Sequence, residues 1–270
     1  MTINDRDFLR LVDFMRSTYG INLEHKRQLI DARLSFDIAR RGYPNFTVYV
    51  ERVIADPSGE ECRHMVNRLS TNYTFFFREP DYIDALCGTV LPDFLSRGKT
   101  HLRIWCAACS SGQEVYSVGM VLEYQKRVYG KPVSYEIVGT DINTEMLGIA
   151  ISGVYPEEEL NQIPTRYRPF ICQHTDRTFS VDAEICRQMT WRDENLLDAV
   201  PPVGGYDIVF CRNVMIYFTQ SLRHDMAKRL SAALCPAGYL FTGATESIDL
   251  ERKYFRYIAP TFYQKAGTRR

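Results

Sequence analysis

The chain has 270 residues, and its 33 lysines and arginines balance 33 aspartates and glutamates to a formal net charge of +0. This balance does not favour a nucleic-acid partner held by phosphate neutralisation. No apolar run reaches the roughly 18 residues of a membrane-spanning helix, and the N-terminus lacks the pattern of an export signal, so we expect no membrane insertion. Eight cysteines in such a chain indicate reduced thiols in a cytoplasm rather than a disulfide framework.

Residues 1–80 have the hydrophobic periodicity of short helices. The first apolar face is followed by Gly20, which stands where a C-terminal glycine cap is expected. A second helix is predicted over about 24–41. A third begins after the cap Asn45 and is stopped by Pro57. We therefore expect an all-helical N-terminal region without strands.

Beyond residue 100, short apolar runs alternate with stretches of helical spacing. This alternation predicts parallel βαβ units whose sheet is covered on both faces, an α/β fold. The apolar runs are "LRIWCAA", "VSYEIVGTD", "YDIVFC" and "GYLFTGAT". Residues 155–192 interrupt the alternation with "RTFSV" and "EICRQMTWR", which we interpret as a small β insertion. The closing "YFRYIAPTFYQK" is predicted to form one antiparallel strand.

Polar side chains follow three of the predicted strands. Gly112 and Glu114 come after the first strand, Asp141 ends the second, and Arg212 and Asn213 follow a later one. Because ligands of an open parallel sheet bind beyond the carboxyl ends of its strands, these side chains are expected to share one site. Gly112 is expected to supply the close backbone approach to a ligand.

Asp141 indicates the class of ligand. An acidic residue that ends the second strand typically binds the two hydroxyls of a ribose. A G-x-G-x-x-G sequence is absent, which argues against a dinucleotide and favours a nucleoside without phosphates, of which S-adenosylmethionine is the commonest. The alternative is that Asp141 only caps the helix beginning near Asn143.

Cys106 and Cys109 lie between a predicted strand and helix, where a redox pair would also sit. A zinc site would need a second close pair of ligands, which the sequence does not offer, so no metal is expected. Small residues suit a loop pressed against a ligand, and free cysteine packs as a small hydrophobe. The packing interpretation is favoured.

Five stretches taken together resemble one family. They are "STNYTFFFRE" (70–79), "WCAACSSGQEVYS" (105–117), "SGVYPEEEL" (152–160), "FCRNVMIYF" (210–218) and "LFTGATES" (240–247). In this order and combination they resemble the CheR-type chemotaxis receptor methyltransferases. The chain lacks a helical-repeat extension after residue 270, so it is expected to be a minimal member.

The resemblance implies a Rossmann-like class I S-adenosylmethionine-dependent methyltransferase domain carrying a small antiparallel β subdomain, preceded by an all-helical domain. The implied boundaries are a receptor-facing N-terminal domain at 1–70, a linker at 71–95 that contributes to the cofactor site, and the methyltransferase domain at 96–270 with its β subdomain at about 155–192. The implied reaction is methyl transfer from S-adenosylmethionine to glutamate side chains of chemoreceptor cytoplasmic domains, which gives glutamyl methyl esters for chemotactic adaptation.

Cofactor contacts carry over from the family's motifs onto matching positions. The implied contacts are Asn72, Thr74, Arg78, Glu114, Asp141, Asn195, Leu196, Arg212 and Asn213. The loop after the first strand departs from the family's usual "GEE", because Gln113 replaces the first acid. Glu114 aligns with the second acid and is expected to face the amino-acid part of the cofactor.

Arg78 and Tyr217 resemble the family's residues nearest the transferred methyl group, and we expect them to position the substrate with support from Arg212. The alternative for Arg78 is a surface ion pair with Glu79 or Asp81. The alternative for Tyr217 is core packing, with its hydroxyl bound to the backbone.

A basic helix is expected to meet the acidic receptor. Its residues are Lys26, Arg27, Arg33, Arg40 and Arg41. The alternative is an ordinary solvated helix face. The loop "CQHTDRTFSVDAE" lacks the glycines of members that bind a receptor C-terminal pentapeptide, so we expect an enzyme independent of that tail. A cytoplasmic monomer, recruited to membrane receptor arrays, is expected.

Three rival hypotheses remain open from the sequence. One is a non-catalytic S-adenosylmethionine-binding scaffold. Another is a nicotinamide oxidoreductase, which the missing phosphate-binding glycines disfavour. The last is a redox protein that uses Cys106 and Cys109.

Overall fold

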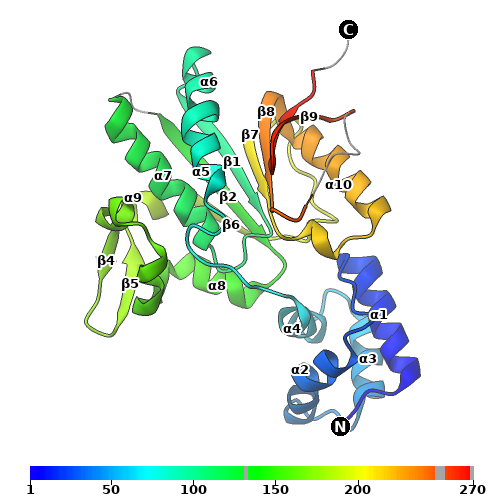
Figure 1. Cartoon of the computed structure of the whole chain (residues 1–270). Coiled ribbons are helices and arrows are strands. Elements are labelled where there is room, and N and C mark those ends of the chain that lie inside the picture. Colours follow the sequence, from blue (N-terminus) through cyan, green and yellow to red (C-terminus); the bar gives the residue numbers. More distant parts are fainter. Residues whose placement is uncertain (131–132, 247–252, 268–270) are drawn as a thin grey trace.

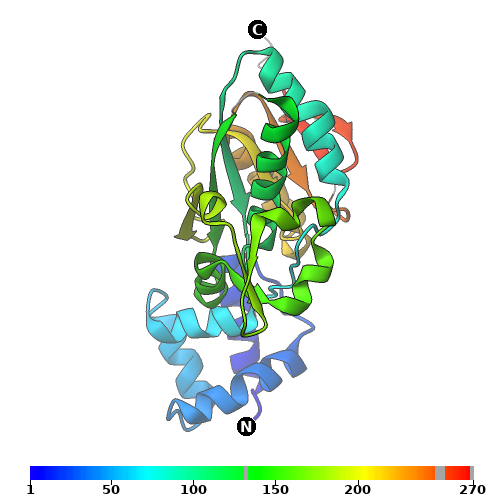
Figure 2. The ribbon, with the colours of Figure 1, turned by 90° about the vertical axis from the view of Figure 1, so that its left-hand side faces the viewer.

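The computed structural model describes residues 1–130, 133–246 and 253–267; Ser247, the last residue of the "LFTGATES" stretch, lies outside the described residues. A bundle of N-terminal helices lies at one end of an α/β domain, as Figures 1 and 2 show from two directions. A small β sheet projects from the side of that domain (Figure 1). In the described part of the chain, no helix is both long and apolar enough to cross a membrane.

The N-terminal bundle consists of four α-helices. They are α1 (Asp5–Tyr19), α2 (Arg27–Arg40), α3 (Phe46–Ala55) and α4 (Glu60–Leu69). The predicted caps are confirmed: Gly20 ends α1 with φ 71°, and the Asn45 side chain accepts from the backbone N–H of Val48 at the start of α3. Helix α2 begins three residues later than predicted, because the chain turns before Lys26, whose N–H donates to the carbonyl of Leu23.

The segment after the bundle is helical again and belongs to the α/β core. It contains α5 (Asp81–Ala85), a π-helical turn η1 (Leu86–Val90) and α6 (Leu91–Ser96). Tyr82, Leu86 and Phe94 are buried in the same apolar cluster as the sheet. Most of the predicted linker at 71–95 is therefore packed structure, and the extended part ends near residue 79.

Seven strands form the main sheet in the order β6-β2-β1-β7-β8-β10-β9. They are β1 (His101–Ala107), β2 (Ser134–Asp141), β6 (Met189–Asp193), β7 (Tyr206–Cys211), β8 (Leu234–Thr242), β9 (Phe255–Ala259) and β10 (Phe262–Lys265). The five strands from β6 to β8 pair in parallel, and β10 and β9 pair antiparallel. The predicted α/β fold is confirmed.

Helices cover both faces of this sheet, as the apolar runs of its strands require. The longest are α7 (Gln113–Tyr129), α8 (Thr144–Ser152) and α10 (Gln220–Ala233). Alternate residues of β1 face opposite sides: Ile104 and Cys106 join the apolar cluster that contains α7, whereas Trp105 and Ala107 join the cluster that contains α10. Each face thus has its own core.

The interruption between β2 and β7 is only partly a β insertion. A three-stranded antiparallel sheet forms in the order β3-β5-β4. Its strands and short helices are β3 (Val154–Pro156), η2 (Glu157–Gln162), η3 (Thr165–Phe170), β4 (Ile171–Gln173), β5 (Thr178–Val181) and α9 (Ala183–Cys186). The end of the run "EICRQMTWR", from Met189 on, was wrongly assigned to this insertion.

That run ends in β6, which pairs in parallel with β2 at the edge of the main sheet. Trp191 explains the placement, because a Cβ at its neighbour Gly139 would lie 2.6 Å from the indole ring. A side chain at position 139 would collide with this indole, so glycine is required there. The chain terminus also differs from the prediction of one strand: β9 and β10 form a hairpin that turns at Thr261, with φ 62°.

The helical bundle is bonded directly to the loops at the carboxyl ends of the strands. The Asn67 side chain donates to Thr144 Oγ1 at 2.9 Å and accepts from the Thr144 N–H at 3.0 Å. Asn143, the cap of α8, donates to the Asn67 carbonyl at 3.0 Å. The Asn195 side chain donates to the Thr18 carbonyl at 2.8 Å. These contacts place the end of α1 beside the strand ends.

Candidate functional site

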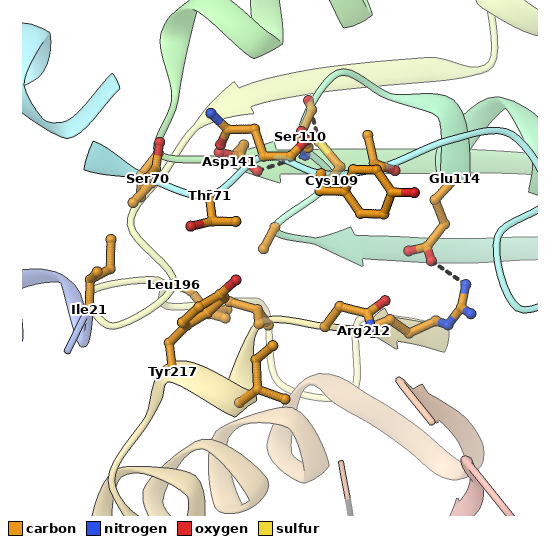
Figure 3. A pocket seen from close by; sticks show the side chains of 18 of the residues that line it. Ile21, Ser70, Thr71, Cys109, Ser110, Glu114, Asp141, Leu196, Arg212 and Tyr217 are labelled. Atoms are coloured by element: carbon orange, nitrogen blue, oxygen red, sulfur yellow. Dashed lines mark hydrogen bonds and ion pairs between the residues drawn. The ribbon is translucent and has the colours of Figure 1, made fainter. Parts of the chain in front are cut away.

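A cavity of about 290 Å³ lies beyond the carboxyl ends of β1, β2 and β7. Its walls come from the end of α1, the segment 70–78 and the loops after these strands and after β6. Figure 3 shows Asp141 on one side of the cavity and Tyr217 on the other. An ion pair between Glu114 and Arg212 closes one end (Figure 3).

The structure brings all ten of the predicted cofactor and catalytic residues to the wall of this cavity. Five separate parts of the sequence supply them, and the last of these includes the short turn η4 (Met215–Tyr217), which carries Tyr217. They are Asn72, Thr74, Arg78, Glu114, Asp141, Asn195, Leu196, Arg212, Asn213 and Tyr217. The role of each residue remains a prediction.

Asp141 has the environment expected of a ribose-binding carboxylate. It is buried, and its two oxygens accept from the backbone N–H groups of Ser110 at 2.7 Å and Asn143 at 2.8 Å. Burial raises the pKa of this carboxyl, and the N–H donors partly oppose that shift. A carboxylate offers about four lone-pair positions, so acceptor capacity remains for two hydroxyl groups. The residue therefore fits a nucleoside.

The alternative role of Asp141 as the cap of α8 is wrong. The cap is Asn143, whose side-chain oxygen accepts from the N–H groups of Glu145 and Met146, each at 3.1 Å. The Asp141 carboxylate accepts instead from the N–H of Ser110, in the loop after β1, and from the N–H of the cap residue Asn143 itself.

The expected role of Gly112 also needs correction. This glycine has φ 89°, but a Cβ on it would lie 2.8 Å from Ala150 and 3.0 Å from Trp191, so its lack of a side chain serves packing between elements. The backbone that borders the cavity is Ala108 to Ser110, and both of these residues have left-handed φ angles of 56° and 51°. Strain of this kind persists where surrounding contacts fix it.

Arg212 is the centre of a charged network at one end of the cavity. Its guanidinium donates to Glu114 at 2.6 Å and to Glu79 at 3.1 Å, and it lies 4.8 Å from the centre of the Tyr82 ring. Burial lowers the pKa of Arg212, but the neighbouring carboxylates and Tyr82 outweigh it, and the net shift is upward. Arg212 is thus charged and already paired within the protein.

Arg78 approaches the cavity from the linker. It donates to the Tyr73 carbonyl at 2.6 Å and lies 5.3 Å from the centre of the Tyr73 ring. The alternative ion pair with Glu79 is present only loosely, with 3.8 Å between Nε and Oε1. The guanidinium therefore keeps donors for a ligand, since it carries five N–H groups.

Tyr217 has features of both of its interpretations. It packs partly against the apolar cluster that contains α10, and it also lines the cavity opposite Asp141 (Figure 3). Beside it, Leu196 is buried in the same wall. The Asn195 side-chain amide, by contrast, donates to the Thr18 carbonyl at 2.8 Å and to the Asp198 carboxylate at 2.9 Å. Both of these amide bonds are therefore made within the protein.

Several residues of the site have no counterpart in the sequence prediction. Tyr19 and Ile21 bring the helical bundle into the cavity wall, and no motif of the sequence indicates this. Glu246 lies in the quoted "LFTGATES" stretch and accepts from four backbone N–H groups, including those of Asn213 and Met215. Through its bonds to Asn213, Met215 and Ile216, Glu246 fixes the turn that carries Tyr217.

Cys106 and Cys109 do not behave as a reactive pair. Both are buried as free thiols, and burial raises the pKa of each well above its ordinary value. Cys109 lines the cavity, as the packing interpretation predicts. Among the described residues, no group of histidine, cysteine, aspartate and glutamate side chains could hold a metal ion.

The basic residues predicted to meet a partner are largely engaged within the bundle. Arg41 pairs with two glutamates at the start of α4, each at 2.7 Å, and Arg40 lies 3.4 Å from Asp37. Arg27 pairs with Asp5 at 2.6 Å, and Arg33 donates to two carbonyls near the end of α4. The helix therefore offers less unpaired positive charge than its sequence indicates.

Known proteins share both parts of this architecture. A family model described as "CheR methyltransferase, SAM binding domain" matches residues 72–263, and one described as "CheR methyltransferase, all-alpha domain" matches residues 6–70. The chain belongs to the CheR methyltransferase family. It is an S-adenosylmethionine-dependent methyltransferase, which confirms the predicted cofactor and enzyme class and leaves the scaffold, nicotinamide and redox hypotheses without support.

Curated relatives extend the match over nearly the whole chain. A chemotaxis protein methyltransferase of Borreliella burgdorferi is 32% identical over 98% of this chain and 96% of its own length. One of Vibrio parahaemolyticus is 34% identical over 92% of this chain and 91% of its own. A probable chemotaxis protein methyltransferase of Rhizobium etli is 35% identical over 92% of this chain and 95% of its own.

Proposed function

We propose that this methyltransferase esterifies glutamate side chains on the cytoplasmic helices of chemoreceptors, as the names of its relatives favour. The observation that carries the proposal is one cavity that Asp141, Arg78 and Tyr217 all line, with Arg78 coming from the linker and Tyr217 from the η4 turn. S-adenosylmethionine supplies a methyl group on a sulfonium centre. The residues of the protein have to position the substrate carboxylate against this methyl group.

A glutamate carboxylate suits this arrangement because it is already an anionic nucleophile and needs no general base. The protein has to align a carboxylate oxygen with the methyl group and exclude water from it. Arg78 is proposed to hold one oxygen and leave the other to attack, since an arginine bonded to both would weaken the nucleophile. Tyr217 is proposed to face the same carboxylate.

Within the cofactor site, Asp141 is proposed to accept from both ribose hydroxyls. Glu114 keeps one oxygen outside its 2.6 Å bond to Arg212, which suits the amino group of the cofactor's methionine part. The backbone at Ala108 to Ser110 is proposed to lie against the nucleoside, and the linker residues Asn72 and Thr74 to cover it.

The domain division that supports this function is also a proposal. Residues 1–70 are proposed to face the receptor, and residues 96–270 to carry out the transfer, with 71–95 joining them. The basic residues of α2 are proposed to guide the acidic receptor, although their internal ion pairs should make this steering weak. The β4–β5 turn is short and closed by a 2.9 Å bond from the His174 N–H to the Thr178 carbonyl, which suits an enzyme that needs no receptor tail.

Methyl transfer to a purified receptor cytoplasmic fragment tests the proposal directly. With radiolabelled S-adenosylmethionine, label should enter the fragment and be released by mild base as volatile methanol, the signature of a methyl ester. A fragment whose target glutamates are replaced by glutamine is the matched control and should take up no label. Base-stable label, or equal label in both fragments, would refute a glutamate substrate.

A further inference from the structure

The turn that delivers Arg78 to the cavity is conformationally strained. Phe77 has φ 57° and Glu79 has φ 49°, so two residues with side chains adopt left-handed backbone conformations on either side of Arg78. Such conformations are energetically unfavourable for residues with side chains and persist only where surrounding contacts hold them. The contacts that hold this turn therefore decide where Arg78 points.

The first anchor of the turn is Phe77. Its backbone N–H donates to Ser117 Oγ at 3.0 Å, and its ring stacks on Tyr167 with centroids 4.7 Å apart. Both partners belong to the α/β domain, in α7 and η3. This side of the turn is buried and apolar, with Phe77 almost fully covered.

The second anchor is the Glu79 carboxylate, which does not line the cavity. Oε1 accepts from the Asn213 side chain at 3.1 Å, and Oε2 accepts from Arg212 at 3.1 Å and from the Ala244 N–H at 3.1 Å. Burial raises the pKa of Glu79, but these three donors outweigh it and the net shift is downward. The carboxylate is thus ionised and held from three directions.

The same contacts restrain Arg212. Its Nη2 donates to the carbonyl of Arg78 at 3.0 Å and to Glu79, while Nη1 donates to Glu114. Because Arg212 is already bonded to the carboxylates of Glu79 and Glu114, it is not free to bind the carboxylate of a substrate. Arg78 donates to the Tyr73 carbonyl but has only a loose 3.8 Å ionic contact to Glu79, so it remains the arginine available to a substrate carboxylate.

We propose that Glu79 is a positioning residue for methyl transfer: its carboxylate locks the 77–79 turn onto Arg212, Asn213 and Ala244, and thereby presents Arg78 to the substrate while withholding Arg212. This inference rests on the proposed function, since it assumes that Arg78 holds the substrate carboxylate. Glu79 touches neither cofactor nor substrate in this scheme. Its effect should appear in turnover rather than in cofactor affinity.

The test compares Glu79→Ala and Glu79→Gln with Asp81→Ala, an exposed acid two residues along the same segment. With a receptor fragment and saturating S-adenosylmethionine, Glu79→Ala should lower kcat about tenfold or more, because small displacements of a positioning group have effects of this size. Glu79→Gln, which keeps an acceptor oxygen, should lie in between. Asp81→Ala should match wild type.

A double-mutant cycle separates positioning from general damage. On an Arg78→Ala background, Glu79→Ala should add less than about a twofold further loss, because it acts through Arg78. Calorimetric affinity for S-adenosylhomocysteine should stay within about threefold of wild type in every Glu79 variant. Additive losses, an unchanged kcat, or a loss of cofactor-product affinity as large as the loss of kcat would overturn the inference.

A crystal structure of Glu79→Ala with S-adenosylhomocysteine makes the test independent of the receptor. The 77–79 turn should shift and Arg78 should leave the cavity wall. An Arg78 that stays in place would refute the inference even if wild type failed to methylate any receptor, a failure that would instead refute the proposed function.

Discussion

Single buried carboxylates determine much of the geometry of the site. Asp141 and Glu246 are both nearly inaccessible, and burial raises the pKa of both carboxyls against the effect of their backbone N–H donors. Glu246 bonds to the turn that includes Asn213, whose φ is 59°, and so fixes the approach of Tyr217. Both acids thus hold backbone segments of the site in place through the N–H groups that they accept from.

The thiols offer a prediction at the same scale. Because burial raises the pKa of Cys106 and Cys109 well above the ordinary value, both stay protonated at neutral pH and should react slowly with a thiol reagent. Cys172, which is exposed, should react first. Mass spectrometry after brief labelling, with urea-unfolded protein as the control, measures the order. Early labelling of Cys106 or Cys109 would revive a redox role.

At the scale of elements, helix α8 links the cofactor site to the bundle through its cap. Asn143 bonds to two N–H groups of its own helix and also to the Asn67 carbonyl and to Ser70 Oγ at 2.8 Å. Asn45 caps α3 in the bundle with an exposed bond to Val48 and makes a suitable comparison.

Asn143→Ala should cost about 2–4 kcal/mol in free energy of unfolding, because it removes a cap and leaves buried acceptors unpaired. Asn45→Ala should cost about 1 kcal/mol, the ordinary value of a cap. Urea unfolding measures both. Asn143→Ala should also weaken S-adenosylhomocysteine binding, since Asn143 adjoins Asp141, whereas Asn45→Ala should not. Equal effects of the two variants would contradict the structural link.

The type and the order of the elements could be predicted from the sequence where the hydrophobic periodicity was strong. Which strands pair with one another could not be predicted in this way. The helices near Gly20 and Asn45 and the alternating strands are encoded by local caps and apolar spacing. The edge strand β6 was misassigned because alternation alone does not say which sheet a strand joins; here the fit of Trp191 on Gly139 decides. The hairpin turn at Thr261 was missed because Pro260 and Thr261 lack the usual glycine signal.

The site was predictable in so far as its residues fall in motifs or at strand ends. All ten predicted residues converge on the cavity. Tyr19 and Ile21 could not be found in this way, because their contribution depends on how the bundle docks against the strand ends. The anchoring roles of Glu79 and Glu246 likewise depend on turns whose left-handed residues are not glycine.

For the whole molecule, the contact between bundle and α/β domain should matter for catalysis. Gly20 ends α1 with φ 71°, and a Cβ there would lie 2.8 Å from the ring of Phe218, which follows Tyr217. Gly42 has φ 84° but faces open space. The two glycines therefore form a matched pair that separates backbone strain from domain packing.

Gly42→Ala should cost about 1–2 kcal/mol, the strain of a left-handed residue with a side chain. Gly20→Ala should cost about 1–3 kcal/mol more because it overpacks the contact with Phe218, and it should also lower the rate of methyl transfer. Thermal unfolding and the receptor assay measure the two effects. If both variants lose the same stability and keep full activity, the domain contact has no catalytic role.

The most direct test of the account is calorimetric titration of S-adenosylhomocysteine into wild type and Asp141→Ala, with Asp81→Ala as the control. Wild type and Asp81→Ala should bind alike. Asp141→Ala should lose affinity by about a hundredfold or more, because each lost hydrogen bond to a charged group is worth about 1.5–3 kcal/mol. Undiminished binding by Asp141→Ala would contradict the placement of the cofactor at the end of β2.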